Sequence, residues 1–286
     1  MQVLNTASVA LETTLLLHGV PIGQGLPLAA ELSAIVSAAG AKPAIIGIVN
    51  GIPTVGLTDS QLTELLASTN VPKVNSSNLG LILHRKSHGA TTVSTTMELA
   101  AAAGIRFFAT GGLGGVHRNY SSHLDVSADL AAFTRFPVAV VTSGVKSILD
   151  VVATRELLES LGVPVVGFRT TRFPAFYLRE SDAAVDASFD DPADLARFCR
   201  AELDRTGRGI VVCNPIPIAD ELPRAQWDRW LAEAVARSPA DGRDVTPSIL
   251  ANLHVLSGGQ TLRANLALVR SNAALAAQLA VLARRD

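Results

Sequence analysis

Three side chains with catalytic chemistry each lie beside a short apolar run. Glu12 closes one run, Lys146 follows another, and Lys73 opens a third, shorter one. A carboxyl at the end of an apolar strand is costly unless it is paired or used, and it could donate a proton. An amine beside an apolar strand and the positive end of a helix is favoured in its neutral, nucleophilic form. These residues indicate proton transfer and nucleophilic attack.

Lysine is rare in this chain, which draws attention to Lys146. Only four of the 24 basic residues are lysines: Lys42, Lys73, Lys86 and Lys146. Lys73 and Lys146 could converge, so that repulsion lowers the pKa of one amine or one of them holds a phosphate. A half-exposed lysine at a helix start and a solvated glutamate at a strand end explain the same residues without any chemistry.

The elements that must position these residues alternate between two periodicities. Apolar, strand-like runs occupy 8–13, 43–49, 105–110, 137–142, 164–168 and 209–215, and helical patterns occupy 25–39, 94–103, 147–160 and 193–204. The alternation predicts an α/β fold with a mostly parallel central sheet, helices on both faces and a helical C-terminal part from 219 to 285. Without repeats or linkers, 1–286 is predicted to be one domain. The site should lie at the carboxyl ends of the strands.

Several loops between these elements could bind ions. The helix after Thr92 begins with free backbone N–H groups, which favour an anion. The GGLGG loop at 111–115 resembles a phosphate cradle, although His117 stands where a dinucleotide motif has its last glycine. Ser127 or Asp129 could simply cap the next helix, whereas Asp125 could bind a hard divalent cation through oxygen and water ligands.

Asn265 and Asn272 lie seven residues apart in the predicted C-terminal helix and therefore share one face. This face could serve recognition, or the spacing could be incidental.

The composition favours a reduced, oligomeric, cytoplasmic protein. Charged residues make up 17% and hydrophobic ones 48%, so we expect apolar surface to be hidden against another subunit. The net charge of −1, without a basic cluster, argues against a nucleic-acid partner. Cys199 and Cys213 lack metal-ligand spacing and are expected to be reduced core residues. We expect neither a signal peptide nor a membrane span.

Seven motifs in order resemble the pseudouridine-5′-phosphate glycosidases. They are ALETTLLLHGVP, GATTVSTTM, FATGGLGGVHR, DVSADL, GVKSILD, FPAFY and NPIP, and they cover nearly the whole chain. The resemblance implies an α/β/α sandwich, a homotrimer and a divalent metal such as Mn²⁺. It also implies reversible cleavage of pseudouridine 5′-phosphate, at its C–C glycosidic bond, to uracil and ribose 5-phosphate.

Carried over position by position, the resemblance makes Glu12 the proton donor, Lys146 the nucleophile and Asp125 the metal-binding residue. It places the following residues at the substrate: Lys73, Val93, His117, Ser127, Ala128, Asp129 and Asn265. A C–C bond has no oxygen leaving group to protonate, so the two-carboxylate mechanism of ordinary glycosidases does not apply. An imine between Lys146 and the opened sugar would act as the electron sink instead.

The chain departs from the family pattern at the edge of the pocket. The family usually has serine, basic residues and an aspartate after the first site lysine, whereas this chain has the uncharged run 74–78, and Val145 replaces the usual alanine. The identity of the aglycone therefore stays between two alternatives. The alternative to the glycosidase is a C-glycosynthase that joins ribose 5-phosphate to an aromatic polyketide aglycone. A non-catalytic sugar-phosphate-binding protein would be expected to lack Lys146 or Glu12, and both are present.

Overall fold

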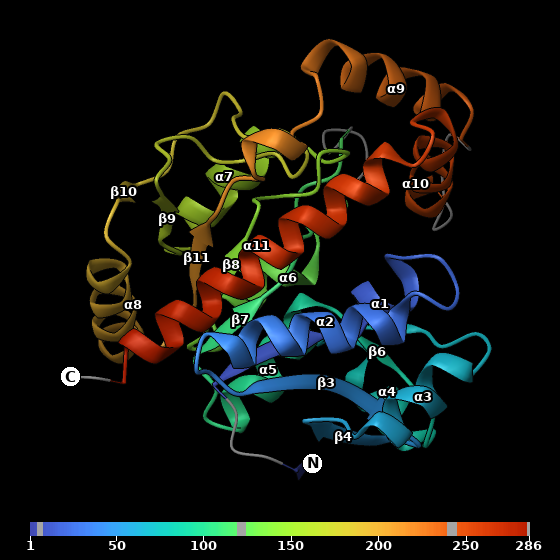
Figure 1. Cartoon of the computed structure of the whole chain (residues 1–286), viewed down its shortest axis with the longest axis vertical. Coiled ribbons are helices and arrows are strands. Elements are labelled where there is room, and N and C mark those ends of the chain that lie inside the picture. The colour runs from blue at the N-terminus through green and yellow to red at the C-terminus, as the bar shows by residue number, and fades with distance from the viewer. Residues whose placement is uncertain (5–7, 119–123, 239–244, 285–286) are drawn as a thin grey trace.

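The computed structural model describes residues 1–4, 8–118, 124–238 and 245–284. Within these ranges the chain folds around a nine-stranded sheet (Figure 1). Its strands lie in the following order: β1 (Gln2–Val3), β4 (Ile52–Val55), β3 (Pro43–Val49), β2 (Val9–Glu12), β7 (Phe107–Ala109), β8 (Ala139–Thr142), β11 (Ile210–Cys213), β9 (Val165–Phe168) and β10 (Ala187–Phe189). Among the described strands of this sheet only β3 and β4 pair antiparallel, which confirms the mostly parallel sheet.

The central strands are buried on both faces, as their uninterrupted apolar runs predict. All four residues of β2, β8 and β11 are buried. Leu11 pairs with Ala109, and Phe108 pairs with Val140. This register brings the carboxyl ends of β2, β7 and β8 to one edge of the sheet.

Helices cover both faces of the sheet. On one face, α2 (Gly25–Ala38), α8 (Pro192–Thr206) and α11 (Gln260–Leu282) pack together, and α11 runs diagonally over β7 and β8 (Figure 1). Right-handed crossovers between the parallel strands place the connections α5 (Val93–Ala102), α6 (Ala128–Ala132) and α7 (Val151–Ser160) on the other face.

The remaining elements flank this sandwich. They are α1 (Thr14–His18), α3 (Asp59–Ala67), α4 (Leu79–His84), the 3₁₀ turn Ile218–Asp220, α9 (Arg224–Ala236), α10 (Val245–Leu256) and a small parallel pair of β5 (Lys73–Val74) with β6 (Ala90–Thr91). The capping box of Thr58 and Gln61 begins α3 as its sequence pattern indicates. Cys199 and Cys213 are free and buried, as expected for core residues.

The helix predicted to start directly after Lys146 begins later. It starts at Val151, because the carboxylate of Asp150 accepts a hydrogen bond from the Ala153 N–H and caps the helix there. The preceding residues bond elsewhere: the Lys146 N–H donates to the carbonyl of Leu113 at 3.1 Å. Lys146 therefore lies in a loop, not at a helix start.

The expectation that no segment reaches the length of a membrane span was wrong for α11. Its 23 residues have a window of mean hydropathy 1.2, which is long and apolar enough for a span. Half of that window is buried within the protein, and the helix packs against α2, β7 and β8. These contacts are those of a helix that covers the core.

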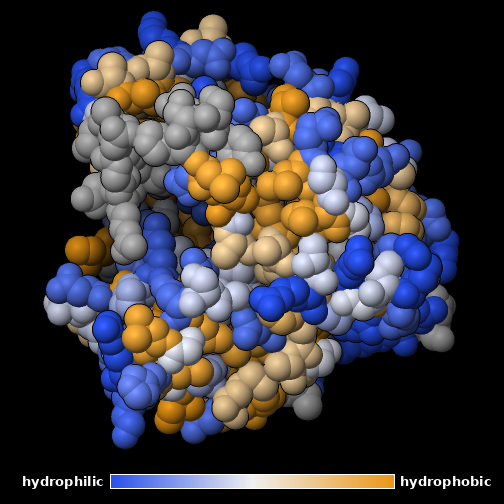
Figure 2. Space-filling model, turned by 180° about the vertical axis from the view of Figure 1, so that it is seen from behind, coloured by the Kyte–Doolittle hydropathy of each residue, from blue (hydrophilic) through white to orange (hydrophobic). Residues whose placement is uncertain are grey.

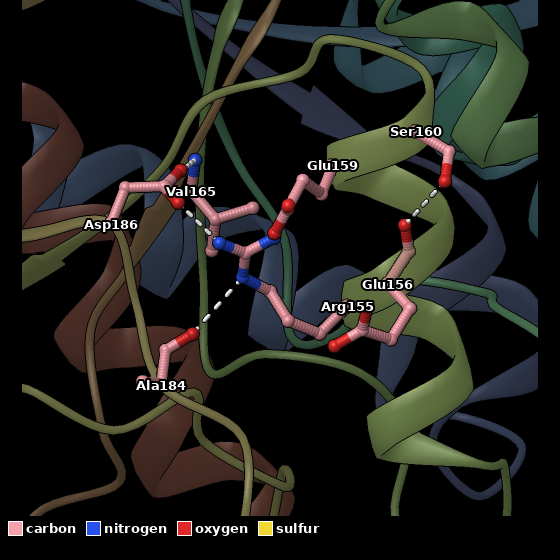
Figure 3. Close-up of polar contacts among 7 residues, drawn as sticks. All are labelled: Arg155, Glu156, Glu159, Ser160, Val165, Ala184 and Asp186. Carbon is pink, nitrogen blue, oxygen red and sulfur yellow. Dashed lines mark hydrogen bonds and ion pairs between the residues drawn. The ribbon is translucent and has the colours of Figure 1, made fainter.

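A buried arginine ties α7 to the segment that leads into β10 (Figure 3). Arg155 donates through Nε to the carbonyl of Ala184 at 3.0 Å and through Nη2 to the carboxylate of Asp186. The second oxygen of Asp186 accepts the Val165 N–H at 2.8 Å. The Arg155 side chain thereby holds the loop after β9, which carries the FPAFY motif, against the sheet.

We predict that Arg155→Met lowers the free energy of unfolding by about 2–3 kcal/mol, because it leaves the carboxylate of Asp186 and the carbonyl of Ala184 without their donor. The value is below that of a fully buried pair because the Asp186 side chain is 44% exposed. Urea unfolding measures the change. Arg205→Met is the matched control, since its pair with Glu202 is solvent-exposed on the arginine side and should contribute less than about 1 kcal/mol. Equal losses in both variants would contradict the role of Arg155.

Candidate active site

Polar residues follow four central strands at the same edge of the sheet. Glu12 ends β2, Thr110 follows β7, Thr142 ends β8 and Asn214 follows β11. All four are buried. The predicted position of the site, at the carboxyl ends of the strands, therefore coincides with a cluster of buried polar groups.

Glu12 is the most perturbed of these groups. Burial raises the pKa of its carboxyl to about 7, and the charge of Asp129 adds to the rise. The charge of Lys146, a hydrogen bond from the Thr110 hydroxyl and the charge of Lys73 act in the opposite direction. Since the folded-state pKa exceeds the ordinary one, keeping Glu12 here costs stability as the pH rises through about 7, which is typical of a group retained for function.

Lys146 lies in a tightly held loop between β8 and α7. On one side, Gly144 has φ +82°, and a β-carbon there would lie 1.8 Å from the carbonyl oxygen of Pro174. On the other side, the Ser147 hydroxyl donates to the carbonyl of Ala175 and accepts the Tyr177 N–H at 3.3 Å. The backbone of Lys146 is thus fixed, with its charge acting on Glu12.

Lys73 converges with Lys146, as the sequence suggested. It lies on β5. Desolvation and then repulsion from Lys146 lower the pKa of its ammonium group, while Glu12 opposes the change. The structure thus brings Glu12, Lys73 and Lys146 within electrostatic reach of one another from three separate segments.

In the GGLGG loop, which resembles a phosphate cradle, protein groups already bond two of the backbone N–H groups and pack closely beside the glycines. The Leu113 N–H donates to the carbonyl of Gly144, and the Gly114 N–H donates to the carboxylate of Asp129. A β-carbon on Gly114 would lie 2.3 Å from the Ser127 hydroxyl, and one on Gly112 would lie 2.4 Å from the ring of Phe176. The glycines allow close packing around Lys146.

Ser127 and Asp129 connect this loop to the start of α5. Ser127 caps α6 by accepting the Asp129 N–H, which is the simpler of the two expected roles. The buried carboxylate of Asp129 accepts N–H groups from Gly114 at 2.9 Å and Ser94 at 3.0 Å. Val93, Ser127, Ala128 and Asp129 therefore lie together, with Val93 at the first turn of α5.

Asp125 and His117 form a separate pair at the outer end of the same loop. His117 Nδ1 lies 3.6 Å from the Asp125 carboxylate, and the His117 N–H donates to the Asp125 carbonyl at 3.0 Å. The Asp125 side chain is 64% exposed. Asp125 is not among the charges that shift the pKa of Glu12, whereas Asp129 is.

Asn265 approaches the site from α11. Its Nδ2 donates to the Gly19 carbonyl at 3.4 Å, while its buried Oδ1 finds no hydrogen-bond partner in the described part of the chain. A β-carbon on Gly111 would lie 3.3 Å from this oxygen. Asn265 therefore presents an unsatisfied acceptor beside the residue that follows Thr110.

The uncharged run after Lys73 satisfies its own amides. Asn75 Oδ1 accepts the N–H and the hydroxyl of Ser77, both at 2.9 Å, and Asn78 Oδ1 accepts the Asn75 N–H at 2.9 Å. The Ser76 N–H donates to the Ser94 hydroxyl at 3.3 Å, and the Ser76 hydroxyl is buried without a partner. The run 74–78 therefore carries no charge and contacts α5 through Ser76.

Three residues at the site were not predicted as part of it: Thr110, Asn272 and Phe176. Thr110 was treated only as the last residue of a strand, and Asn272 only as a possible recognition residue. Phe176 has φ +59°, an uncommon conformation for an aromatic residue, and packs on Gly112. The polar end of an apolar strand was the available signal for Thr110, but the hydrogen-bond partners of these residues come from distant segments.

The geometry combines a protonatable acid with two amines in a partly desolvated site. Such a set can move a proton to a leaving group and form a covalent bond to a carbonyl carbon.

Known proteins share both the sequence and the fold. The profile of the family described as indigoidine synthase A like protein matches residues 3–282. The pseudouridine-5′-phosphate glycosidase of a Nocardioides species is 45% identical over 95% of this chain and 90% of its own length. The enzyme of the same name from Methylobacterium nodulans is 47% identical over 96% of this chain and 83% of its own length.

Two solved structures superpose over almost the whole chain. The crystal structure of the prealnumycin C-glycosynthase AlnA in complex with ribulose 5-phosphate has a TM-score of 0.90 and 36% identity, covering 97% of this chain and 91% of that one. An indigoidine synthase A-like protein from Thermotoga maritima has a TM-score of 0.91 and 33% identity, covering 99% and 96%. The chain belongs to the indigoidine synthase A-like family, which includes the pseudouridine-5′-phosphate glycosidases.

Proposed function

We propose that this protein cleaves the C–C glycosidic bond of pseudouridine 5′-phosphate reversibly, through an imine between the sugar and Lys146. The observation that carries the proposal is the cluster of Glu12, Lys73 and Lys146 at one sheet edge, in which Glu12 has a pKa of about 7. At neutral pH such a carboxyl is present both as an acid and as a base, which suits it to give and take one proton in a cycle.

Each bond change can be assigned to a residue. The neutral amine of Lys146 attacks C1′ of the ribose while Glu12 gives its proton to the ring oxygen, so the ring opens. The Glu12 carboxylate then takes a proton from the ammonium nitrogen formed at C1′ and passes it to C5 of uracil. The C1′–C5 bond breaks with its electrons on C5, and the nitrogen lone pair forms the protonated imine at C1′. Water adds to the imine carbon and releases ribose 5-phosphate and the amine. One water is consumed, and the reverse sequence forms the bond.

The other site residues fit recognition of the sugar phosphate. Lys73 supplies a positive charge, and the start of α5 at Val93 lies beside Ser127, Ala128 and Asp129. We assign substrate contacts to these residues and to His117. Asn265 Oδ1 is a buried acceptor without a partner within the described residues, and a donor from the substrate would remove that energetic cost.

A C-glycosynthase is the second candidate, favoured by two observations. The structural neighbour AlnA is a prealnumycin C-glycosynthase seen with ribulose 5-phosphate. In this chain the edge formed by Asn75 to Asn78 is uncharged and self-bonded. In that reaction an electron-rich aromatic carbon would attack the imine carbon on Lys146, so the roles of Glu12 and Lys146 are the same.

The resemblance implies a divalent metal, and Asp125 fits a hard cation that keeps most of its waters. Its exposed carboxylate beside His117 offers an oxygen ligand with room for water. Among the residues that the structure describes, no group of three or more His, Cys, Asp and Glu side chains could hold a metal. A cation held by Asp125 would therefore need water and the substrate phosphate to complete its coordination. The bound cation, Mn²⁺ as the resemblance implies, would supply positive charge for the sugar phosphate.

The homotrimer and the cytoplasmic location stay predictions. Support for an oligomer comes from exposed large hydrophobic side chains, among them Ile22, Leu124, Ile218 and Val255. Hydrophobic residues also gather in a patch on the face drawn in Figure 2. Such patches favour contact with another subunit.

The imine predicts a covalent trap. Borohydride added with ribose 5-phosphate should attach the sugar to the peptide that contains Lys146, as mass spectrometry would show. Lys146→Arg keeps the charge but cannot form an imine, so both adduct and turnover should be lost. Lys42→Arg, a substitution at an exposed position before β3, is the control and should label like the wild type. Labelling of Lys73 in place of Lys146 would overturn the assignment.

The metal assignment predicts a binding defect that does not depend on turnover. Asp125→Asn should weaken Mn²⁺ binding, measured by electron paramagnetic resonance, by more than about tenfold. A chelator should stop wild-type turnover and Mn²⁺ should restore it. Asp220→Asn, which changes an exposed carboxylate in the 3₁₀ turn, is the control. Wild-type Mn²⁺ affinity in Asp125→Asn would exclude Asp125 as a ligand.

The two candidate functions predict different outcomes in a pair of assays on one preparation: uracil release from pseudouridine 5′-phosphate, and consumption of ribose 5-phosphate with polycyclic phenols. We expect uracil release to be faster, because the Asn265 acceptor suits a small N–H-bearing base. One hydrogen bond that only one aglycone makes is worth about 1–3 kcal/mol, or roughly 5- to 150-fold in specificity. Lys146→Arg is the blank in both assays. Phenol C-ribosylation with negligible uracil release would assign the synthase.

A further inference from the structure

One residue of the C-terminal helix α11 lies at the centre of a fully buried hydrogen-bond network that connects three strand ends. Asn272 Nδ2 donates to the Thr110 carbonyl at 2.8 Å and to the Ser143 hydroxyl at 3.2 Å. Its Oδ1 accepts from Asn214 Nδ2 at 3.0 Å. Thr110, Ser143 and Asn214 follow β7, β8 and β11, respectively. One amide side chain thereby fixes the carboxyl ends of three neighbouring strands.

Thr110 transmits this constraint to Glu12. The Thr110 N–H donates to the Val141 carbonyl at 3.1 Å, and the Thr110 carbonyl accepts from Asn272, so its backbone is held from both sides. The Thr110 hydroxyl donates to Glu12 Oε1. A buried hydroxyl that donates to a carboxylate both orients it and stabilises its charged form.

We propose that Thr110 and Asn272 are positioning residues that hold the Glu12 carboxyl toward the substrate and keep it able to lose its proton. The inference rests on the proposed role of Glu12 as the proton donor, and it adds two residues to the reaction. Asn272 reaches Glu12 through the Thr110 backbone, and Thr110 contacts Glu12 directly through its hydroxyl.

The other groups that act on Glu12 come from separate elements. Lys146 lies in the loop after β8, Asp129 in α6 and Lys73 on β5. Lys146 and Lys73 favour the carboxylate, and Asp129 opposes it. In the described part of the chain none of these three residues hydrogen-bonds to Thr110 or Asn272, so substitutions in the network leave those charges in place.

The experiment is a titration of Glu12 by infrared difference spectroscopy, with Glu12→Gln as the blank. Thr110→Val keeps the shape of the side chain but removes the hydroxyl, so the midpoint should rise from about 7 by about one pH unit. Thr110→Ser keeps the hydroxyl and should stay near the wild type. Asn272→Ala should shift the midpoint of Glu12 in the same direction, but by less.

Steady-state kinetics give a second readout. In Thr110→Val and Asn272→Ala kcat should fall, while KM for the sugar phosphate should change less than about twofold, since neither residue contacts the proposed phosphate site.

Ser271→Ala is the matched control, because the Ser271 hydroxyl accepts from Asn214 but does not touch Thr110. It should leave the Glu12 midpoint unchanged. A wild-type midpoint and kcat in Thr110→Val would overturn the inference. If Asn272→Ala does not fold, the comparison of Thr110→Val with Thr110→Ser still tests whether Thr110 positions Glu12. Failure of the wild type to trap ribose 5-phosphate would overturn the proposed function instead, and the titration would still show whether the network controls Glu12.

Discussion

The site depends on the burial of one carboxyl at the end of an apolar strand. Desolvation raises the pKa of Glu12 from an ordinary value of 4.5 to about 7, which corresponds to roughly 3 kcal/mol against its charged form. The Thr110 hydroxyl and the charges of Lys146 and Lys73 limit the rise, and Asp129 adds to it. A group that must be both acid and base near neutral pH needs this balance of opposing effects, and each effect comes from a different segment of the chain.

The close packing around Lys146 follows from the same need. A loop that carries a nucleophile, the role proposed for Lys146, has to keep its position while bonds form and break, since misplacement of a reacting group slows the reaction strongly. The GGLGG segment lies directly against the loop of Lys146, with the Leu113 carbonyl accepting the Lys146 N–H. Phe176, in its strained conformation, covers Gly112. The glycines that resemble a phosphate cradle therefore serve to bring three backbone segments together.

The strand order brings these pieces to one edge. Because β2, β7, β8 and β11 are adjacent and parallel, the residues that follow them meet at one edge although they lie as far apart in sequence as Glu12 and Asn214. Helix α11 then crosses this part of the sheet and contributes Asn265 with an unsatisfied oxygen and Asn272 with a satisfied one. The two asparagines share a helical face but serve different purposes, since one is available to a ligand and the other closes a network.

The sequence by itself determined the architecture and which charged groups come together at the strand ends. Uninterrupted apolar runs alternating with helical periods predict a parallel sheet, because such strands must be buried on both faces, and this holds for β2, β3, β8 and β11. The position of Glu12 at the end of β2 and the scarcity of lysine identified Glu12, Lys73 and Lys146. Only the tertiary structure decided where helix α7 begins, that the GGLGG loop packs against the loop of Lys146, and that Asn272 contacts Thr110, which donates to Glu12. The physical reason is that these features depend on hydrogen bonds and close contacts between segments far apart in the chain, such as Asn272 with Thr110, and no local pattern encodes which partner a buried polar group will find.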